Sequence, residues 1–222
     1  VIIPAPYWVS YPAMTQLAQG IPIPVRTSFE QNYRLTPEQL EEAITDKTRV
    51  LILCSPSNPT GSCYSKQDLE GLAEVLRKYP NISIISDEIY EYIVFDEEHI
   101  SLLNVAPNLK DRVALINGFS KGFAMTGWRL GYLAGPEELV KAVGKIQSQE
   151  TSAPSSISQA AGFAAYSGTL DDIEVMRTSF KERRDFMVEQ LNSIEGVSCF
   201  SPGGAFYVFP DISSYLGSVT PS

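Results

Sequence analysis

Short apolar runs alternate with longer segments of helical character along this chain, and this alternation limits the folds that it can adopt. The apolar runs lie at residues 1–3, 49–54, 82–86, 113–116 and 130–134, and the helical segments at residues 36–44, 65–77, 136–146, 155–166 and 170–193. Such an order is typical of an α/β domain in which helices cover a largely parallel sheet. Because the runs show little polar alternation, we expect them to be buried on both faces.

The chain changes character near Arg184. The long amphipathic segment 170–193 leads into two strand-like runs, 196–200 and 205–209, on either side of Pro202. We therefore expect residues 1–184 to form a large domain and residues 185–222 to begin a small α+β C-terminal domain. The chain has no initiator Met, opens on what resembles the end of a strand and closes on no complete element, so we expect a fragment of a longer protein.

Composition narrows the classes of function. A net charge of -9 and a pI of about 4.7 argue against a nucleic-acid or anionic-membrane surface. No apolar run approaches the roughly 20 residues of a transmembrane helix, and no signal peptide is visible, so a cytoplasmic protein is expected. The three cysteines form no Cys-x-x-Cys pair, which predicts neither a disulfide framework nor a cysteine-ligated metal site. We expect no metal.

Polar and aromatic side chains follow the predicted strands at the points where each ends. They are Trp8, Asn58, Asp87, Tyr90, Ser120 and Lys121. In open α/β sheets, ligands bind beyond the carboxyl ends of the strands. The sequence therefore predicts that these side chains converge on one crevice.

Residues 118–122 read Gly-Phe-Ser-Lys-Gly and admit two interpretations. The first is a nucleophile elbow, with Ser120 as the nucleophile of a serine hydrolase. That enzyme needs a histidine that follows the serine, whereas the only histidine, His99, precedes it in an acidic loop and is expected to be solvated. The hydrolase remains the alternative from another enzyme class.

The second interpretation makes Lys121 the reactive group. A lysine amine beside another cation, here Arg129, is a good Schiff-base former, and its usual partner is pyridoxal phosphate. That cofactor needs a carboxylate on its ring nitrogen, for which Asp87 is the candidate. Tyr90 and Asn58 are candidate donors to its phenolic oxygen. Its phosphate needs a hydroxyl and a guanidinium, for which Ser120 and Arg129 are the candidates, and Trp8 is a candidate for stacking on the ring.

Four motifs carry a family resemblance in this order and spacing. They are Asn58-Pro-Thr-Gly61, Asp87-Glu-Ile-Tyr90, Phe119-Ser-Lys121 and Met125-Thr-Gly-Trp-Arg-Leu-Gly-Tyr132. Together they resemble the class I aminotransferases of the fold-type I pyridoxal phosphate enzymes, with a three-layer α/β/α large domain. The segment Pro6-Tyr-Trp-Val-Ser-Tyr-Pro12 is similar to the bacterial aspartate aminotransferase subgroup.

The resemblance implies a homodimer that transfers an amino group between an amino acid, best aspartate, and a 2-oxo acid, best 2-oxoglutarate. Lys121, Asp87 and Tyr90 would be catalytic. Asn58, Ser120, Arg129 and Trp8 would also bind the cofactor. The family's phosphate loop and its carboxylate-binding arginine have no counterpart here, so we expect the fragment alone to be largely inactive.

Other interpretations stay open. An aromatic or kynurenine aminotransferase or a carbon-sulfur lyase would keep the same residues. A non-catalytic domain is a further alternative. Taken singly, each site residue also has an ordinary structural explanation, such as a turn, a cap or core packing. Gly203 and Gly204 are expected to form a turn. Lys181, Arg183 and Arg184 are expected to form a solvated helix face.

Overall fold

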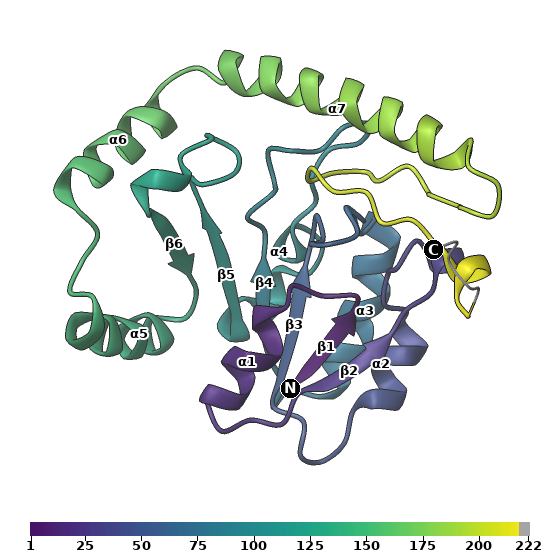
Figure 1. Ribbon diagram of the computed structural model, residues 1–222. Helices are drawn as coiled ribbons and strands as arrows, with labels where there is room; N and C mark the ends of the chain where they lie inside the picture. The colour runs from purple at the N-terminus through teal and green to yellow at the C-terminus, as the bar shows by residue number, and fades with distance from the viewer. Residues whose placement is uncertain (218–222) are drawn as a thin grey trace.

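The computed structural model describes residues 1–217, and this part of the chain folds around one six-stranded sheet (Figure 1). The strands are β1 (Ile2–Ala5), β2 (Ile23–Arg26), β3 (Val50–Cys54), β4 (Ser83–Asp87), β5 (Val113–Gly118) and β6 (Gly131–Ala134). Their order is β2-β1-β3-β4-β5-β6; the first five are parallel, and β6 is antiparallel to β5. The predicted α/β class with a mostly parallel sheet is confirmed.

The α-helices in the described chain are α1 (Ser10–Leu17), α2 (Pro37–Ala43), α3 (Lys66–Lys78), α4 (Leu102–Val105), α5 (Glu137–Glu150), α6 (Ser156–Ser167) and α7 (Asp171–Asn192). Short 3-10 helices lie at Phe29–Gln31, Pro107–Arg112, Thr126–Trp128 and Ser213–Tyr215. Thr36 and Ser65 are the N-cap residues of α2 and α3, since their hydroxyls accept hydrogen bonds from the backbone N–H groups of Gln39 and Asp68. These bonds fix where α2 and α3 begin.

The sheet buries apolar side chains on both faces. Leu51 and Leu53 of β3 point into the main core with α2, α3 and α4, whereas Ile52 packs on the opposite face with Ile3 and Tyr11, beside α1. Figure 1 shows α1 in front of the sheet, α5 and α6 beyond β6, and α7 above the strand ends. The layers leave the carboxyl ends of β3, β4 and β5 facing the chain that follows α7.

Two predictions about strands were wrong. Residues 130–134 were expected to be buried on both faces, but β6 is an edge strand, and Gly131, Tyr132 and Ala134 are exposed. Residues 196–200 form only one isolated bridge, Ser198 with Asp211, and residues 205–209 form none, although Gly204 just before them bridges to Val94. Their backbone groups bond to neighbouring loops, so no ladder extends between them.

Sequence reasoning missed β2 and α1. β2 contains Pro24, which argues against a strand but is tolerated at the edge of a sheet, where β2 lies. α1 has a weak apolar period, and the residue at its N-cap position, Val9, forms no side-chain hydrogen bond with the helix. α7 runs unbroken through Arg184, and the domain boundary there stays a prediction. Residues 218–222, predicted to belong to the second domain, lie outside the described residues.

Replacing Leu72 by alanine is expected to lower the free energy of unfolding by about 2–5 kcal/mol, because truncation of a buried leucine loses apolar burial and leaves a cavity. Leu72 is completely buried in α3. Urea unfolding of this chain, followed by circular dichroism, measures the change. Leu17→Ala is the matched control, because the Leu17 side chain is 85% exposed. Equal destabilisation by both variants would contradict the assigned core.

Candidate active site

Three neighbouring parallel strands end at the same level and create the floor of a cavity. In the register of the sheet, Asp87 at the end of β4 lies opposite Cys54 of β3 and Ile116 of β5. The cavity above them measures about 320 Å³ and is lined by Trp8, Tyr11, Cys54, Asn58, Asp87, Ile89, Tyr90, Ile116, Lys121 and Tyr207. Five of the seven predicted site residues therefore share one cavity: Trp8, Asn58, Asp87, Tyr90 and Lys121.

Asp87 places a carboxyl group at the base of the cavity. Its Oδ2 accepts a hydrogen bond from the Tyr11 hydroxyl at 2.6 Å, and its Oδ1 accepts one from the Ile89 N–H at 3.3 Å. Burial raises the pKa of Asp87 above its ordinary value, although these two hydrogen bonds oppose the rise. A cation in the cavity would favour the ionised form of this carboxyl.

Lys121 lies three residues beyond the end of β5 and is half-buried. Its Nζ lies 5.4 Å from the centroid of the Phe206 ring and 5.9 Å from that of the Tyr90 ring. Within residues 1–217 it forms no salt bridge with a carboxylate. The amine therefore meets aromatic faces and the open cavity.

Tyr90 is buried, and its hydroxyl lies 2.7 Å from the hydroxyl of Tyr207. Burial, and then the hydrogen bond with Tyr207, raise the pKa of Tyr90 above its ordinary value, so the phenol keeps its proton at neutral pH. The Phe206 ring packs edge-on against Tyr90, with centroids 5.4 Å apart. The ring and the hydroxyl of Tyr90 are thus held by Phe206 and Tyr207, in the segment that follows Gly204.

Trp8 and Asn58 form other parts of the lining. The Trp8 side chain is 38% exposed and meets the Tyr11 ring edge-on, with centroids 5.5 Å apart. Asn58 is half-buried in the loop after β3. An aromatic face and a polar amide therefore both border the cavity.

Ser120 and Arg129 do not line the cavity. Ser120 is half-buried beside Lys121, whereas Arg129 is exposed, has a left-handed backbone with φ 51°, and donates from Nη1 to the Thr126 carbonyl at 2.9 Å. Their roles in binding phosphate stay predictions.

Sequence reasoning missed Tyr11, Cys54 and Tyr207. Tyr11 lies three residues after Trp8, on the missed helix α1, and Tyr207 lies in the run that was predicted to be a strand. Burial raises the pKa of the Cys54 thiol to about 12, so Cys54 is a neutral part of the wall. Gly203 and Gly204, just before Tyr207, were a usable sequence signal that this segment approaches the site, because glycines allow the backbone to come close to neighbouring groups.

The expectation that His99 is solvated was wrong. Its Nε2 lies 2.8 Å from Glu88 Oε2, and its side chain is only 13% exposed. Burial alone would raise the pKa of Glu88, but hydrogen bonds from His99, Ser101 and Ser86 outweigh it and lower that pKa. Since His99 bonds to Glu88, the described residues show no Ser120–His99 pair for a hydrolase. Glu91 lies close enough to Glu88 and His99 for the three side chains to hold a metal ion. However, Ser86 and His99 already form hydrogen bonds with the two carboxylate oxygens of Glu88.

The expectation of a solvated face was also wrong for Arg184. Its side chain is 7% exposed, and Nη1 lies 2.6 Å from Asp96 Oδ2 and 2.9 Å from the Pro202 carbonyl oxygen. Lys181 pairs with the same carboxylate at 2.6 Å. These cations lower the pKa of Asp96 to about 2 and tie α7 to the loop after β4.

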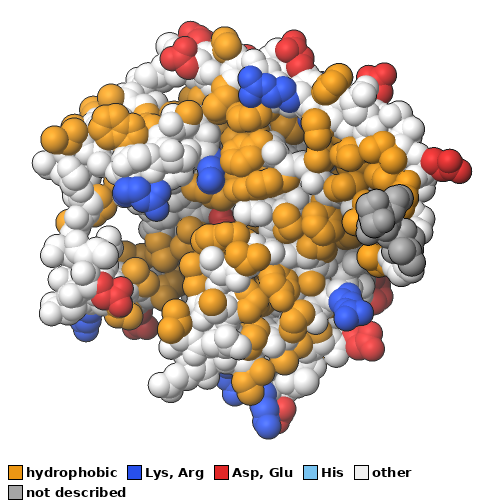
Figure 2. All heavy atoms as spheres, in the orientation of Figure 1, with side chains coloured by type: hydrophobic (Ala, Val, Ile, Leu, Met, Phe, Trp, Pro, Cys, Tyr) orange, Lys and Arg blue, Asp and Glu red, His pale blue; other side chains and the backbone are white. Residues whose placement is uncertain are grey.

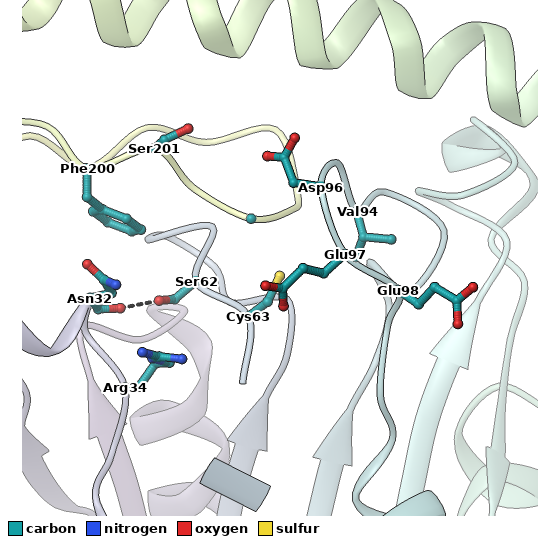
Figure 3. Close-up of a pocket in the computed structure, with 11 residues that line it drawn as sticks. Asn32, Arg34, Ser62, Cys63, Val94, Asp96, Glu97, Glu98, Phe200 and Ser201 are labelled. Atoms are coloured by element: carbon teal, nitrogen blue, oxygen red, sulfur yellow. Dashed lines mark hydrogen bonds between the residues drawn. The ribbon is translucent and has the colours of Figure 1, made fainter. Parts of the chain in front are cut away.

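A second cavity of about 220 Å³ is lined by none of the seven predicted site residues (Figure 3). It is lined by Asn32, Arg34, Ser62, Cys63, Val94, Asp96, Glu97, Glu98, Phe200, Ser201 and Gly203. Its guanidinium, Arg34, is bound to Asp68 at 2.6 Å. The predicted chemistry therefore gathers in the cavity above β4, not here.

Comparison with known proteins agrees with this geometry. The model of the family "Aminotransferase class I and II" matches residues 1–218. The aspartate/prephenate aminotransferase of Cereibacter sphaeroides is 50% identical over 99% of this chain, and the chain covers 55% of that protein. The chain spans about half the length of the curated relatives that it matches.

Solved structures show the same relationship. The aspartate aminotransferase of Rhizobium meliloti superimposes with a TM-score of 0.97 at 46% identity, over 99% of this chain and 55% of that one. An aromatic aminotransferase of Pyrococcus horikoshii reaches a TM-score of 0.90 at 38% identity, over 94% of this chain and 56% of that one. By sequence and by fold, this chain belongs to the class I and II aminotransferase family.

Proposed function

We propose that the full-length protein is a pyridoxal phosphate-dependent aminotransferase that moves the amino group of aspartate to 2-oxoglutarate. Class I aminotransferases use this cofactor. The observation that carries the proposal is the gathering of Lys121, Asp87, Tyr90 and Asn58 from three strand ends into one cavity. Relatives with about 50% identity over the chain support the reaction.

The residues present fit the cofactor. A cavity of about 320 Å³ is within the usual range for small-molecule sites. Its lining offers the Lys121 amine, the half-buried Asp87 carboxyl, the Asn58 amide and three phenols, among them Tyr90. An aldehyde, a pyridine nitrogen and a phenolic oxygen require groups of these kinds. Trp8 adds an aromatic face at the exposed side.

When bound, pyridoxal phosphate supplies an electron sink for reactions at the substrate Cα. In this proposal, Lys121 would hold the cofactor through its Nζ, and the freed amine would then take the proton from the substrate Cα. Asp87 would bind the ring nitrogen and keep it protonated, while the Tyr11 hydroxyl donates a hydrogen bond to Asp87 Oδ2 at 2.6 Å. Tyr90 and Asn58 donate to the phenolic oxygen. Ser120 and Arg129 bind the phosphate.

The substrate assignment rests on the relatives. The Cereibacter relative is named for aspartate and prephenate, so prephenate is a second candidate amino acceptor. The Pyrococcus structure is an aromatic aminotransferase with nearly the same fold, which makes an aromatic amino acid the competing donor. A panel of amino donors on the full-length protein separates these possibilities.

We also propose that the full-length protein is a cytoplasmic homodimer with residues 1–184 in its large domain. Large apolar side chains are exposed on α1 and α6, including Leu17 and Phe163, and Figure 2 shows apolar side chains gathered across one face. Extensive exposed apolar surface is typical of interfaces. No helix of the described chain combines the length and apolar character of a membrane span.

Reduction of the cofactor-loaded full-length protein with borohydride is expected to fix the cofactor on Lys121, because this amine borders the cavity and has no carboxylate partner among residues 1–217. Peptide mass spectrometry locates the label. Lys121→Ala should abolish it, whereas Lys145→Ala, on the exposed side of α5, should not. A label spread over many lysines would contradict the proposed site.

Asp87→Asn is expected to stabilise the cofactor-free chain at neutral pH and to weaken cofactor binding by about 10- to 100-fold. Because the folded-state pKa of Asp87 is raised, the stability that its neutral form contributes is present below the ordinary value of 3.8 and is lost as pH rises through the folded value. The advantage of the variant should therefore grow as pH rises and then level off.

Urea unfolding at several pH values and titration with pyridoxal phosphate measure these two effects. Asp46→Asn, in an exposed loop, is the control for the loss of one carboxylate. Unchanged cofactor affinity in Asp87→Asn would contradict the role given to Asp87.

The full-length protein is expected to convert aspartate and 2-oxoglutarate to oxaloacetate and glutamate, whereas residues 1–222 alone should bind the cofactor weakly and turn over little. A coupled assay for oxaloacetate compares the two at equal concentration. Rapid turnover by residues 1–222 alone would overturn the second expectation, and failure of the full-length protein with every amino donor would overturn the proposed reaction.

A further inference from the structure

The hydroxyl groups of Tyr90 and Tyr207 form a hydrogen bond across 117 residues of sequence. Their oxygens are 2.7 Å apart, and both side chains line the cavity above β4. Each phenol has a single proton to donate. Only one member of the pair can therefore donate to the other, and the second proton is left for another acceptor.

Tyr207 owes its position to backbone contacts at the preceding glycines. The Gly204 N–H donates to the Gly61 carbonyl at 3.0 Å, and the Ala205 N–H donates to the Ile93 carbonyl at 2.8 Å. A Cβ on Gly204 would lie 2.7 Å from the Ile93 carbonyl oxygen, so a side chain there would push the segment away. The segment is thus fixed against the loops that follow β3 and β4.

The surroundings leave Tyr90 few other partners. Its ring meets Phe206 and Tyr207 edge-on, with centroids 5.4 and 5.8 Å away, and the neighbouring buried side chains are apolar. Within residues 1–217, the hydrogen bond of the Tyr90 hydroxyl goes to Tyr207. The cavity is the remaining place where this hydroxyl finds an acceptor.

We infer that Tyr207 is a positioning residue for Tyr90. The Tyr207 hydroxyl donates to the Tyr90 oxygen, which directs the Tyr90 proton into the cavity toward the cofactor's phenolic oxygen. A phenol that accepts one hydrogen bond is also a stronger donor of its own. The inference rests on the proposed function, because that function places the phenolic oxygen beside Tyr90.

The test follows the visible absorbance of the cofactor bound to the full-length protein as a function of pH. Tyr207→Phe is expected to raise the midpoint of this absorbance change by about half a pH unit. Without Tyr207 the Tyr90 hydroxyl is less well oriented, so it stabilises the negative phenolic oxygen of the cofactor less. Tyr90→Phe should raise it further. Tyr166→Phe is the matched control, since it breaks another tyrosine pair of 2.7 Å, with Tyr132, outside this cavity.

A double-mutant cycle separates positioning from a general structural effect. If Tyr207 acts through Tyr90, then Tyr207→Phe causes no further shift in a Tyr90→Phe protein. An unchanged midpoint in Tyr207→Phe, or an equal shift in both backgrounds, would overturn the inference. Melting temperatures check that each variant is folded. If the wild-type protein takes up no cofactor at Lys121, the proposed function fails, and the inference fails with it.

Discussion

Parallel pairing of β3, β4 and β5 is the constraint on which the rest of this structure depends. It brings three carboxyl ends to one level, so that loops from distant parts of the sequence deliver an amide, a carboxyl group, a phenol and an amine to one cavity. Burial on both faces holds those strands in place, with Leu51 and Leu53 on one side and Ile52 on the other. A rigid sheet positions groups more precisely than loops alone.

The Asp87 carboxyl shows how the proposed function opposes stability. Burial disfavours its charge in the cofactor-free chain, and the Tyr11 hydroxyl only partly compensates. A protonated ring nitrogen would supply the missing positive charge and lower the free energy of the ionised carboxylate. The unfavourable free energy of burying the Asp87 charge would then be offset by the cofactor that this charge binds. Such perturbed ionisable groups are typical of functional sites.

Much of the fold and half of the cavity wall could be predicted from the sequence. Buried strands such as β3 and capped helices such as α3 are specified locally, by aliphatic runs and by Ser65. Residues directly after strand ends, such as Asp87 and Lys121, follow from the general position of sites in α/β sheets. The family motifs added the chemistry expected of each.

The remaining wall depends on tertiary contacts that no local pattern encodes. Tyr11 belongs to an uncapped helix with a weak apolar period, and Tyr207 reaches the cavity only because Gly61 and Gly204 allow two loops to touch. His99 and Arg184 were expected to be solvated, but His99 is paired with Glu88 of the same loop, and Arg184 with Asp96 from a distant segment. Charged residues in such pairs look like surface residues in sequence.

The most direct test of the central claim is a crystal structure of the full-length protein grown with pyridoxal phosphate. The account predicts continuous density from Lys121 Nζ to the cofactor, with the ring nitrogen beside the Asp87 carboxylate. Cofactor attached to another lysine, or bound with its ring nitrogen away from Asp87, would contradict it.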